Sequence, residues 1–170
     1  MSNAVIRKAI AADATGIAIV AAYTWATAYS GLLPDSLLKN RIEALPQNAG
    51  RIKSLIEKGT FEYAVAVQDN AVIGFCGYGK SRNPKFAQHG EISALYILKG
   101  FAGKGIGREI FEFAAIQLKA AGCEKMIINC LEGNPSLNFY IHMGGNVVGS
   151  REDEIFGGYK IKEHILEFDL

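Results

Sequence analysis

The chain has 170 residues, of which 49% are hydrophobic and 21% charged, and 18 basic side chains against 17 acidic ones give a net charge of +1. This length predicts one domain, residues 1–170, that buries about 70% of the surface of the unfolded chain, and the composition excludes a disordered chain. A charge so close to zero argues against a nucleic-acid partner. We therefore expect a small molecule or another protein as the partner.

The cysteine content and the apolar runs indicate the cellular compartment of the protein. Three cysteines without a C-x-x-C spacing fit neither a disulfide framework nor a zinc site: Cys76, Cys123 and Cys130. No apolar run approaches the roughly 20 residues of a membrane span, and Arg7, Lys8 and Asp13 interrupt any signal-peptide pattern at the start. We expect a cytoplasmic protein with reduced thiols, no metal and no membrane contact.

The first half of the chain predicts one strand, three helices and a meander of strands. Residues 4–10 form a short β-prone run, and residues 13–30 show helical spacing after Asp13, a good N-cap. Two shorter helices are expected over 32–45 and 48–59. Residues 61–81 contain two β-rich runs joined by Asp69-Asn70, which predicts a hairpin, and 91–98 adds a third strand.

The second half predicts a crossover unit followed by a last hairpin. A helix is expected from Gly103 to Ala121 because the following apolar residues fall on one face: Ile106, Ile110, Phe111, Phe113, Ala114 and Leu118. With the apolar strand 125–131 it completes a βαβ unit over 91–131, whose strands should run parallel. A short helix over 134–144 follows, with Asn134 as its cap. Strands over 146–156 and 159–169 should turn at Gly157-Gly158.

The segment "FAGKGIGREI", residues 101–110, places three glycines at the start of the predicted crossover helix. Uncovered N–H groups at the positive end of a helix bind anions such as phosphate. A dinucleotide motif begun at Gly103 meets Arg108 where its last glycine belongs, and a P-loop needs Ser or Thr where Gly105 stands. Spacing thus excludes both nucleotide motifs, and leaves a phosphate cradle or a simple tight turn.

Two segments carry a family resemblance. "EISALYILKGFAGKGIGREIFEF" and "INCLEGNPSLNFYIHMGGNVVGS" resemble, in order and separation, the signature segments of the GCN5-related N-acetyltransferases (GNAT). This resemblance implies an α/β (α+β) fold with a twisted, mostly antiparallel mixed sheet of about seven strands, flanked by helices and containing a splayed parallel strand pair. It also implies an acetyl-CoA-dependent N-acetyltransferase domain that moves acetyl to a primary amine through a tetrahedral intermediate.

The resemblance assigns the acetyl-CoA site to three parts of the chain. The pyrophosphate loop corresponds to Ala102, Gly103, Lys104, Gly105, Ile106 and Gly107, with Arg108 following. Ala102 lacks the Gln or Arg side chain usual in the family, so one contact is missing; Lys104 and Arg108 either compensate as cations or form an ordinary solvated turn. The pantetheine arm is expected along Leu95, Tyr96 and Ile97, with Asn134 as a further hydrogen-bond partner or simply a helix cap.

Two residues are implied as catalytic. Tyr140 matches the family's general acid, which protonates the thiolate of CoA, although a core tyrosine would look the same. Glu91 is the candidate base, acting directly or through water, while other family members use water chains alone. Strand alternation places His89, Glu91 and Ser93 on one polar face that a cleft can reach, and Ile92, Ala94 and Tyr96 on the other.

The acceptor side is less specific. "TWATAYSGLLPDSLL" (24–38) and the ending "FGGYKIKEHILEFDL" resemble bacterial PaiA-like polyamine acetyltransferases, which makes Trp25 and Tyr29 candidates for the acceptor pocket or for the core. Two alternatives stay open: a CoA-binding regulatory module without catalysis, which the Ala102 departure favours and Tyr140 opposes, and a transferase of another acyl-CoA. Exposed edge strands are compatible with a homodimer.

Overall fold

The computed structural model describes residues 3–59, 61–155 and 158–170. Its seven strands form one sheet in the order β1-β2-β3-β4-β5-β7-β6. They are β1 (Val5–Lys8), β2 (Glu62–Gln68), β3 (Ala71–Lys80), β4 (Gly90–Ile97), β5 (Lys125–Leu131), β6 (Asn146–Ile155) and β7 (Tyr159–Asp169). Only β4 and β5 pair in parallel, and every other neighbouring pair is antiparallel. The predicted mixed sheet of about seven strands is confirmed.

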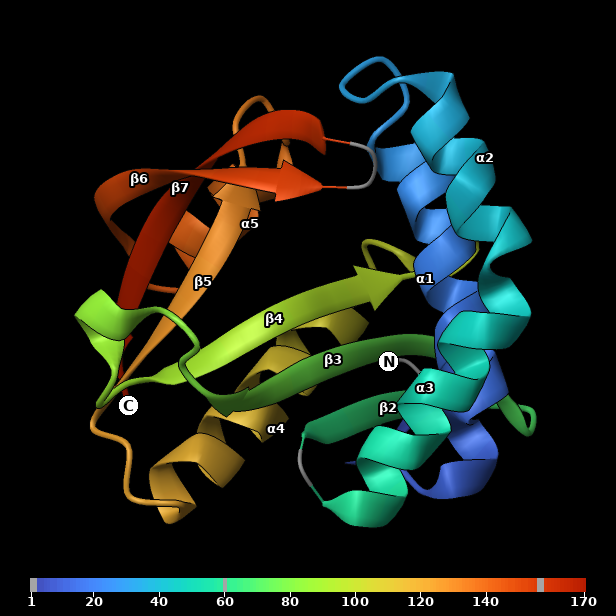
Figure 1. Cartoon of the computed structure of the whole chain (residues 1–170). Coiled ribbons are helices and arrows are strands. Elements are labelled where there is room, and N and C mark those ends of the chain that lie inside the picture. The colour runs from blue at the N-terminus through green and yellow to red at the C-terminus, as the bar shows by residue number, and fades with distance from the viewer. Residues whose placement is uncertain (1–2, 60, 156–157) are drawn as a thin grey trace.

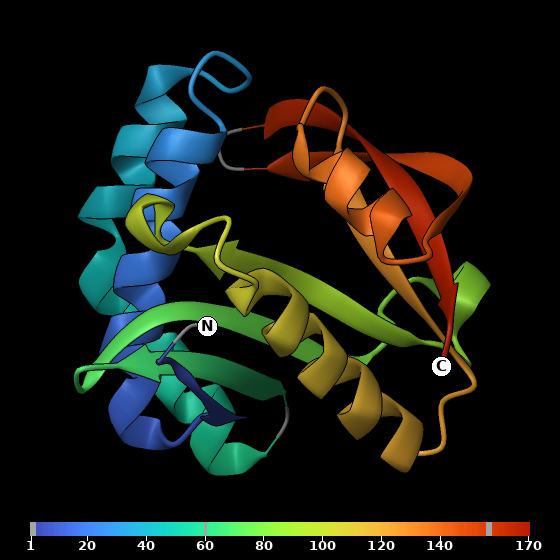
Figure 2. The same ribbon diagram turned by 180° about the vertical axis from the view of Figure 1, so that it is seen from behind.

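Helices cover both faces of this sheet (Figure 1). They are α1 (Ala14–Ala28), α2 (Asp35–Glu43), α3 (Leu45–Lys58), α4 (Ile106–Ala120) and α5 (Ser136–His142). Apolar residues of α1 and α3 pack against β2, β3 and β4 in one core cluster. Residues of α4 and α5 pack in a second cluster on the opposite face, which Figure 2 shows from behind.

The β2–β3 hairpin follows from its turn residues. Asp69 and Asn70 both take positive φ angles, of 51° and 63°, and only this turn geometry matches the twist of two strands joined by two residues. The predicted hairpin is therefore confirmed at its turn. The same logic ends α3, where Gly59 takes a left-handed φ of 62°.

The parallel pair β4–β5 separates soon after it forms. Its register contains three pairs of residues, from Gly90 opposite Met126 to Ile92 opposite Ile128. Beyond Ile92 the two strands diverge, as Figure 1 shows, although β4 continues to Ile97 and β5 to Leu131. The backbone groups of β4 that face β5 therefore lose their strand partner along the second half of β4. This is the splayed pair that the resemblance implied.

A β-bulge at Ser93 corrects the face assignment made from the sequence. Ala94 pairs with Gly77 and Ile92 with Tyr78, so Ser93 is an extra residue in β4. A bulge of this kind breaks simple alternation. Ile92 consequently packs with the α4 side of the sheet, while Ala94 and Tyr96 pack with the α1 side. The expectation that these three residues share one face was wrong.

Two helix starts also differ from the sequence prediction. The helix expected from Gly103 begins at Ile106, with Gly105 as its left-handed N-cap residue, because Gly103 and Gly105 both take positive φ angles that no helix contains. Helix α5 begins at Ser136 rather than Asn134. Pro135 is the N-cap residue, but the Asn134 side chain accepts a hydrogen bond from the Ser136 N–H at 2.9 Å and so satisfies the first N–H of the helix.

Asp13 precedes α1, as predicted, but its carboxylate points backward. It binds the Arg7 guanidinium at 2.7 and 2.9 Å and accepts the Ile10 N–H at 2.8 Å. These contacts tie β1 to the start of α1. Of the last predicted turn, Gly157 and the strand end at Phe156 lie outside the described residues. Among the helices of the described ranges, none is long and apolar enough to cross a membrane.

Candidate functional site

A cavity of about 720 Å³ opens where β4 and β5 diverge. Its walls come from α1, β4, the loop before α4, β5, α5 and the β6–β7 hairpin. Since α1 lies on one face of the sheet and α4 and α5 on the other, the cavity joins both faces through the split between the strands. Two reactants can thus approach one point from opposite sides.

The glycine-rich loop forms one end of this cavity. Ala102, Gly103, Gly105, Gly107 and Arg108 line it. A Cβ added at Gly103 would meet no atom within 4 Å, so open space lies against the backbone there. The first N–H groups of α4 have no partner within the helix and point toward this end, which gives it the positive potential that phosphate groups prefer.

The side chains around the loop modify this potential. Lys99 and Arg108 line the cavity as cations, although Arg108 also binds Glu112 at 2.7 Å. Of the predicted loop residues, Lys104 and Ile106 do not line the cavity: the Lys104 ammonium lies 5.2 Å from the centre of the Phe101 ring, and Ile106 is buried in the core. The backbone, rather than these two side chains, forms the cradle.

Strand β4 supplies the wall between the loop and the centre of the cavity. The predicted pantetheine residues, Leu95, Tyr96 and Ile97, all line it. They follow the point at which pairing with β5 ends, so their backbone N–H and C=O groups on that side are available to a ligand that extends the sheet. Ser93, the bulged residue, lines the same wall, and its hydroxyl donates to the Gly77 carbonyl at 3.3 Å.

Tyr140 in α5 reaches the cavity from the α4 side. Its residue is 8% exposed, and its hydroxyl forms no hydrogen bond with any described residue. Burial raises the pKa of the Tyr140 phenol well above its usual range, and the nearby Tyr96, Cys130 and Cys76 raise it further. The phenol is therefore neutral at physiological pH and keeps its proton.

Three further polar residues border this region. Asn134 lines the cavity beside α5, as the sequence predicted. Thr24 and Asn129 also line it, and the Thr24 Oγ1 and Asn129 Oδ1 atoms are buried with no hydrogen-bond partner among the described residues. Buried polar atoms are nearly always satisfied in native proteins, so these two support a ligand site. Sequence reasoning missed both, although Asn129 is the one amide in the apolar strand β5.

An aromatic cluster from α1 and β4 lines the opposite side of the cavity. The Trp25 indole N–H donates to the Tyr96 hydroxyl at 3.1 Å, and the Tyr29 and Tyr96 hydroxyls lie 3.3 Å apart. All three residues line the cavity. The candidate acceptor residues Trp25 and Tyr29 are thus brought together, and they meet Tyr96 from the predicted pantetheine strand.

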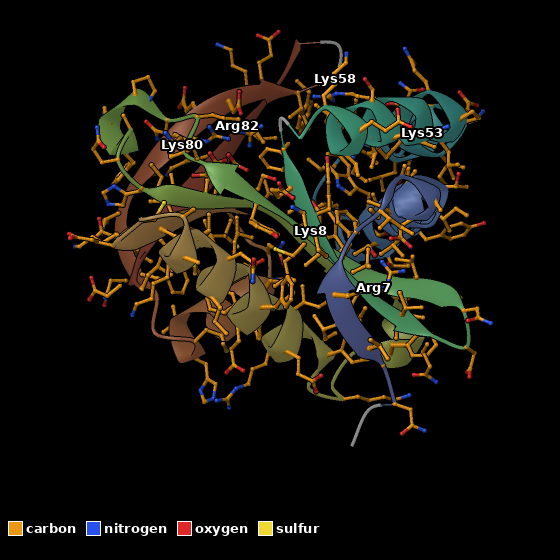
Figure 3. All side chains as sticks on the ribbon, turned by 90° about the horizontal axis from the view of Figure 1, so that it is seen from below. Arg7, Lys8, Lys53, Lys58, Lys80 and Arg82 are labelled. Atoms are coloured by element: carbon orange, nitrogen blue, oxygen red, sulfur yellow. The ribbon has the colours of Figure 1, made fainter. Side chains whose placement is uncertain are left out.

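Glu91 lies differently from the sequence expectation. Its side chain is 3% exposed, and Glu91 does not line the cavity. Its carboxylate accepts the Arg82 backbone N–H at 2.8 Å and the Arg82 guanidinium at 2.7 Å. The polar face that a cleft was expected to reach is instead closed by Arg82, which Figure 3 shows near Lys80 at the end of β3. His89 likewise contacts Glu167, at 2.9 Å.

The β6–β7 hairpin adds two carboxylates: one belongs to the charge run 151–154, which from the sequence either attracts a polycation or is simply solvated, and sequence reasoning did not single out the other. Asp153 and Glu163 line the cavity. Arg151 binds both, with contacts of 2.9 and 2.7 Å. The run of charged residues at 151–154 was the signal in the sequence. No local sequence pattern, however, predicts that this hairpin folds over the diverging strands β4 and β5. In the described ranges, no group of three or more His, Cys, Asp or Glu side chains is arranged to hold a metal ion.

Comparison with known proteins agrees with this geometry. A family model described as the acetyltransferase (GNAT) family matches residues 25–144, which span the aromatic cluster, the glycine loop and Tyr140. YuaI of Bacillus subtilis (strain 168), described as an uncharacterized N-acetyltransferase, is 28% identical over 158 residues, covering 93% of this chain and 88% of that protein.

Two solved structures show the same fold. The PaiA N-acetyltransferase of Thermoplasma acidophilum, in complex with coenzyme A, superposes with a TM-score of 0.76 at 19% identity, covering all of both chains. The acetyltransferase yncA of Salmonella typhimurium, with its cofactor acetyl-CoA, gives a TM-score of 0.67 at 18% identity, covering 99% of this chain and 95% of that one.

Proposed function

Because the chain belongs to the acetyltransferase (GNAT) family, we propose that it transfers the acetyl group of acetyl-CoA to a primary amine that enters from the α1 side of the sheet. One observation carries this proposal. A single cavity connects the glycine loop, the free edge of β4 and the Tyr140 hydroxyl. The phosphate cradle and a neutral proton donor thus lie in one continuous space.

The residues of the chain divide the work of binding. The loop backbone around Gly103 and Gly105 takes the pyrophosphate, and Lys99 and Arg108 add positive charge. The free backbone groups of Leu95, Tyr96 and Ile97 pair with the pantetheine amides as a missing strand would. This pairing directs the thioester toward the bulge at Ser93, where a backbone N–H of β4 beyond its last pair with β5 can polarise the carbonyl.

The chemical step needs a neutral amine. Its nitrogen attacks the thioester carbon, forming a C–N bond and a tetrahedral intermediate, and the C–S bond then breaks. The departing sulfur takes the proton of the Tyr140 phenol, and the amine proton leaves to solvent, after which Tyr140 regains a proton. Glu91, predicted as the base, is held by Arg82 away from the cavity wall, so a proton path to it has to run through water.

The acceptor is proposed to be a small amine. The resemblance to PaiA-like enzymes and the likeness to the PaiA structure support a small soluble acceptor, of which a polyamine is one candidate. A peptide or protein amine is a second candidate, and the cavity volume of about 720 Å³ has to hold part of the donor as well. This volume favours a small molecule or the end of a chain over a folded surface.

The amine-dependent release of CoA thiol tests the proposed function. Purified protein is incubated with acetyl-CoA and a panel of amines, and the released thiol is measured with a thiol reagent. We expect release to rise above the amine-free rate with at least one amine, and to fall when a longer acyl-CoA replaces acetyl-CoA. A protein that binds CoA and releases no thiol with any amine would be a regulatory module instead.

A further inference from the structure

Arg41 in α2 is a cation that no described residue neutralises. Its guanidinium carbon lies 4.9 Å from the centre of the Trp25 ring, over the ring face. Arg7, Arg82, Arg108 and Arg151 each bind a carboxylate, whereas Arg41 forms neither an ion pair nor a hydrogen bond with the described residues. The side chain is half-buried. A partly desolvated guanidinium with five unused donors is suited to an anion.

The surroundings of Arg41 hold this charge beside the cavity. Burial lowers the pKa of the Arg41 guanidinium, and the cation of Arg51 lowers it further, while the hydroxyls of Tyr96, Tyr29 and Tyr63 act in the opposite direction. Arg41 itself does not line the cavity, but Trp25, Tyr29 and Tyr96 do. Because its guanidinium lies over the ring of Trp25, which lines the cavity, Arg41 is one side chain away from the cavity.

The tyrosine pair supplies a second, independent donor. The Trp25 indole can only donate, so the Tyr96 oxygen accepts its hydrogen bond. The contact between the Tyr29 and Tyr96 hydroxyls uses one of their two hydrogens, whichever residue donates. One hydroxyl hydrogen of the pair is left without an acceptor among the described residues, and both residues line the cavity. This side of the cavity thus offers a free hydroxyl hydrogen to a ligand, next to hydroxyl oxygens that can also accept.

We propose that the acceptor of this enzyme is an amine that also carries a carboxylate, such as an amino acid, and that Arg41 and the Tyr29–Tyr96 pair bind this carboxylate. The inference rests on the proposed acetyl transfer and names its substrate class. A planar guanidinium and a phenol together match the planar carboxylate group. The lining carboxylates Asp153 and Glu163 come from the β6–β7 hairpin, where Arg151 offsets part of their charge.

The same arrangement disfavours a polyamine. A polyamine carries only positive charge, so Arg41 would repel the end that reaches the α1 side. The acidic residues of the hairpin are left to face the amine group. One end of the acceptor site is therefore suited to an anion and the other to a cation.

Turnover with matched amine pairs tests the proposal. The panel contains the common L-amino acids, the carboxamide of each one, and spermidine. We expect the best amino acid to exceed its own carboxamide by at least about tenfold in kcat/KM, since a charge-assisted pair is worth that much. Carboxamides or spermidine acetylated as fast as the acids would overturn the carboxylate site and leave the proposed acetyl transfer intact.

Two variants of Arg41 locate the effect. Arg41→Gln should bring the acid and the carboxamide within about threefold of each other, and Arg41→Lys, which keeps the charge without the planar fork, should give an intermediate ratio. Lys53→Gln removes the same charge from the exposed surface of α3, outside the cavity lining, and should leave the ratio unchanged. A discrimination that survives both Arg41 substitutions would contradict the role of Arg41.

A binding measurement separates the two proposals. CoA-bound protein is titrated with N-acetyl-L-amino acids and with their carboxamides, and binding is followed by ligand-observed NMR. We expect at least one N-acetyl amino acid to bind about tenfold tighter than its carboxamide, and Arg41→Gln to remove the difference. Equal binding overturns the carboxylate site whether or not the protein has turnover. Selective binding of the acids without acetylation of any amine would contradict the acetyl transfer alone.

Discussion

At the residue scale, Tyr140 combines three properties of a general acid. It lines the cavity, its burial keeps the phenol neutral, and its hydroxyl has no partner among the described residues. Since the pKa of this phenol is raised rather than lowered, Tyr140 should not produce a limb in the pH–rate profile at physiological pH. The Phe139 ring contacts the Tyr140 ring edge-on, with centroids 5.4 Å apart, and Phe111 contacts Phe139 in turn, at 6.4 Å.

Substitution Tyr140→Phe isolates the proton donor. The ring and its packing are kept, so the affinity for acetyl-CoA and the free energy of unfolding should change little. Turnover should fall by about 10²- to 10⁴-fold, the usual contribution of general acid catalysis. The exposed Tyr23 in α1 gives a matched control, because Tyr23→Phe makes the same change away from the cavity. Turnover of Tyr140→Phe within about threefold of the wild type would contradict the acid role.

Glu91 gives the second prediction at this scale. Both of its oxygens already accept hydrogen bonds from Arg82, and Glu91 does not line the cavity in which the amine would react. We therefore expect Glu91→Gln to reduce kcat/KM by a similar factor at every pH, and to lower the free energy of unfolding by about 1–2 kcal/mol. The measurement is the ratio of mutant to wild-type kcat/KM from acidic to alkaline pH. A ratio that recovers in alkali would instead support the base role predicted from the sequence.

At the element scale, the start of α4 is the part of the chain that we propose to bind the phosphates of the donor. Gly105 takes a φ of 86° as the N-cap residue and lines the cavity. Gly105→Asp should weaken the affinity for acetyl-CoA by at least about tenfold, because its side chain enters the phosphate space and its charge repels the phosphates. Titration calorimetry measures this loss. Gly50→Asp, in α3 with nothing within 4 Å of the added Cβ, is the control and should bind normally. Equal affinities of the two variants for acetyl-CoA would indicate that the loop is a simple turn without a role in phosphate binding.

The junction of β1 and α1 predicts how stability depends on pH. Burial alone would raise the pKa of Asp13, but the hydrogen bonds from Arg7 and from the Ile10 N–H together lower it. A carboxylate with a lowered pKa stabilises the fold above its unfolded pKa of about 3.9, and this contribution is lost as the pH falls through the folded value. Asp13→Asn should therefore cost about 1–2 kcal/mol at pH 7 and progressively less below pH 4. Denaturant unfolding at several pH values measures the difference, and a cost that stays constant down to acid pH would contradict it.

The sequence indicated the elements better than their junctions. The Asp69-Asn70 turn is local, and its two residues alone determine the hairpin. The bulge at Ser93 depends on how β3 and β4 align, which no residue within β4 reveals, and it reversed the face of Ala94 and Tyr96 relative to Ile92. The Arg82–Glu91 pair was missed for the same reason, since its partners meet only when the strands do. Most of the residues that the family resemblance singled out do line the cavity, because the loop and Tyr140 lie in the signature segments.

At the scale of the whole molecule, the sheet consists of two parts that diverge around the cavity. Strands β1–β4 carry α1–α3 and the aromatic cluster, and β5–β7 carry the hairpin with Asp153 and Glu163 (Figures 1 and 2). The seven-residue helix α5 follows β5 and brings Tyr140 to the split. Opening a sheet between two parallel strands exposes backbone groups at its centre, and an acyl donor that pairs with them completes the sheet.

The fate of the acetyl group tests this account most directly. Acetyl-CoA with an isotope-labelled acetyl group is incubated with the protein and the amine that releases most thiol, and the products are analysed by mass spectrometry. We expect the label in an amide on the amine nitrogen, in an amount equal to the CoA thiol released. Label recovered only as free acetate, or retained in acetyl-CoA although the donor binds, would contradict acetyl transfer to an amine in the split of the sheet.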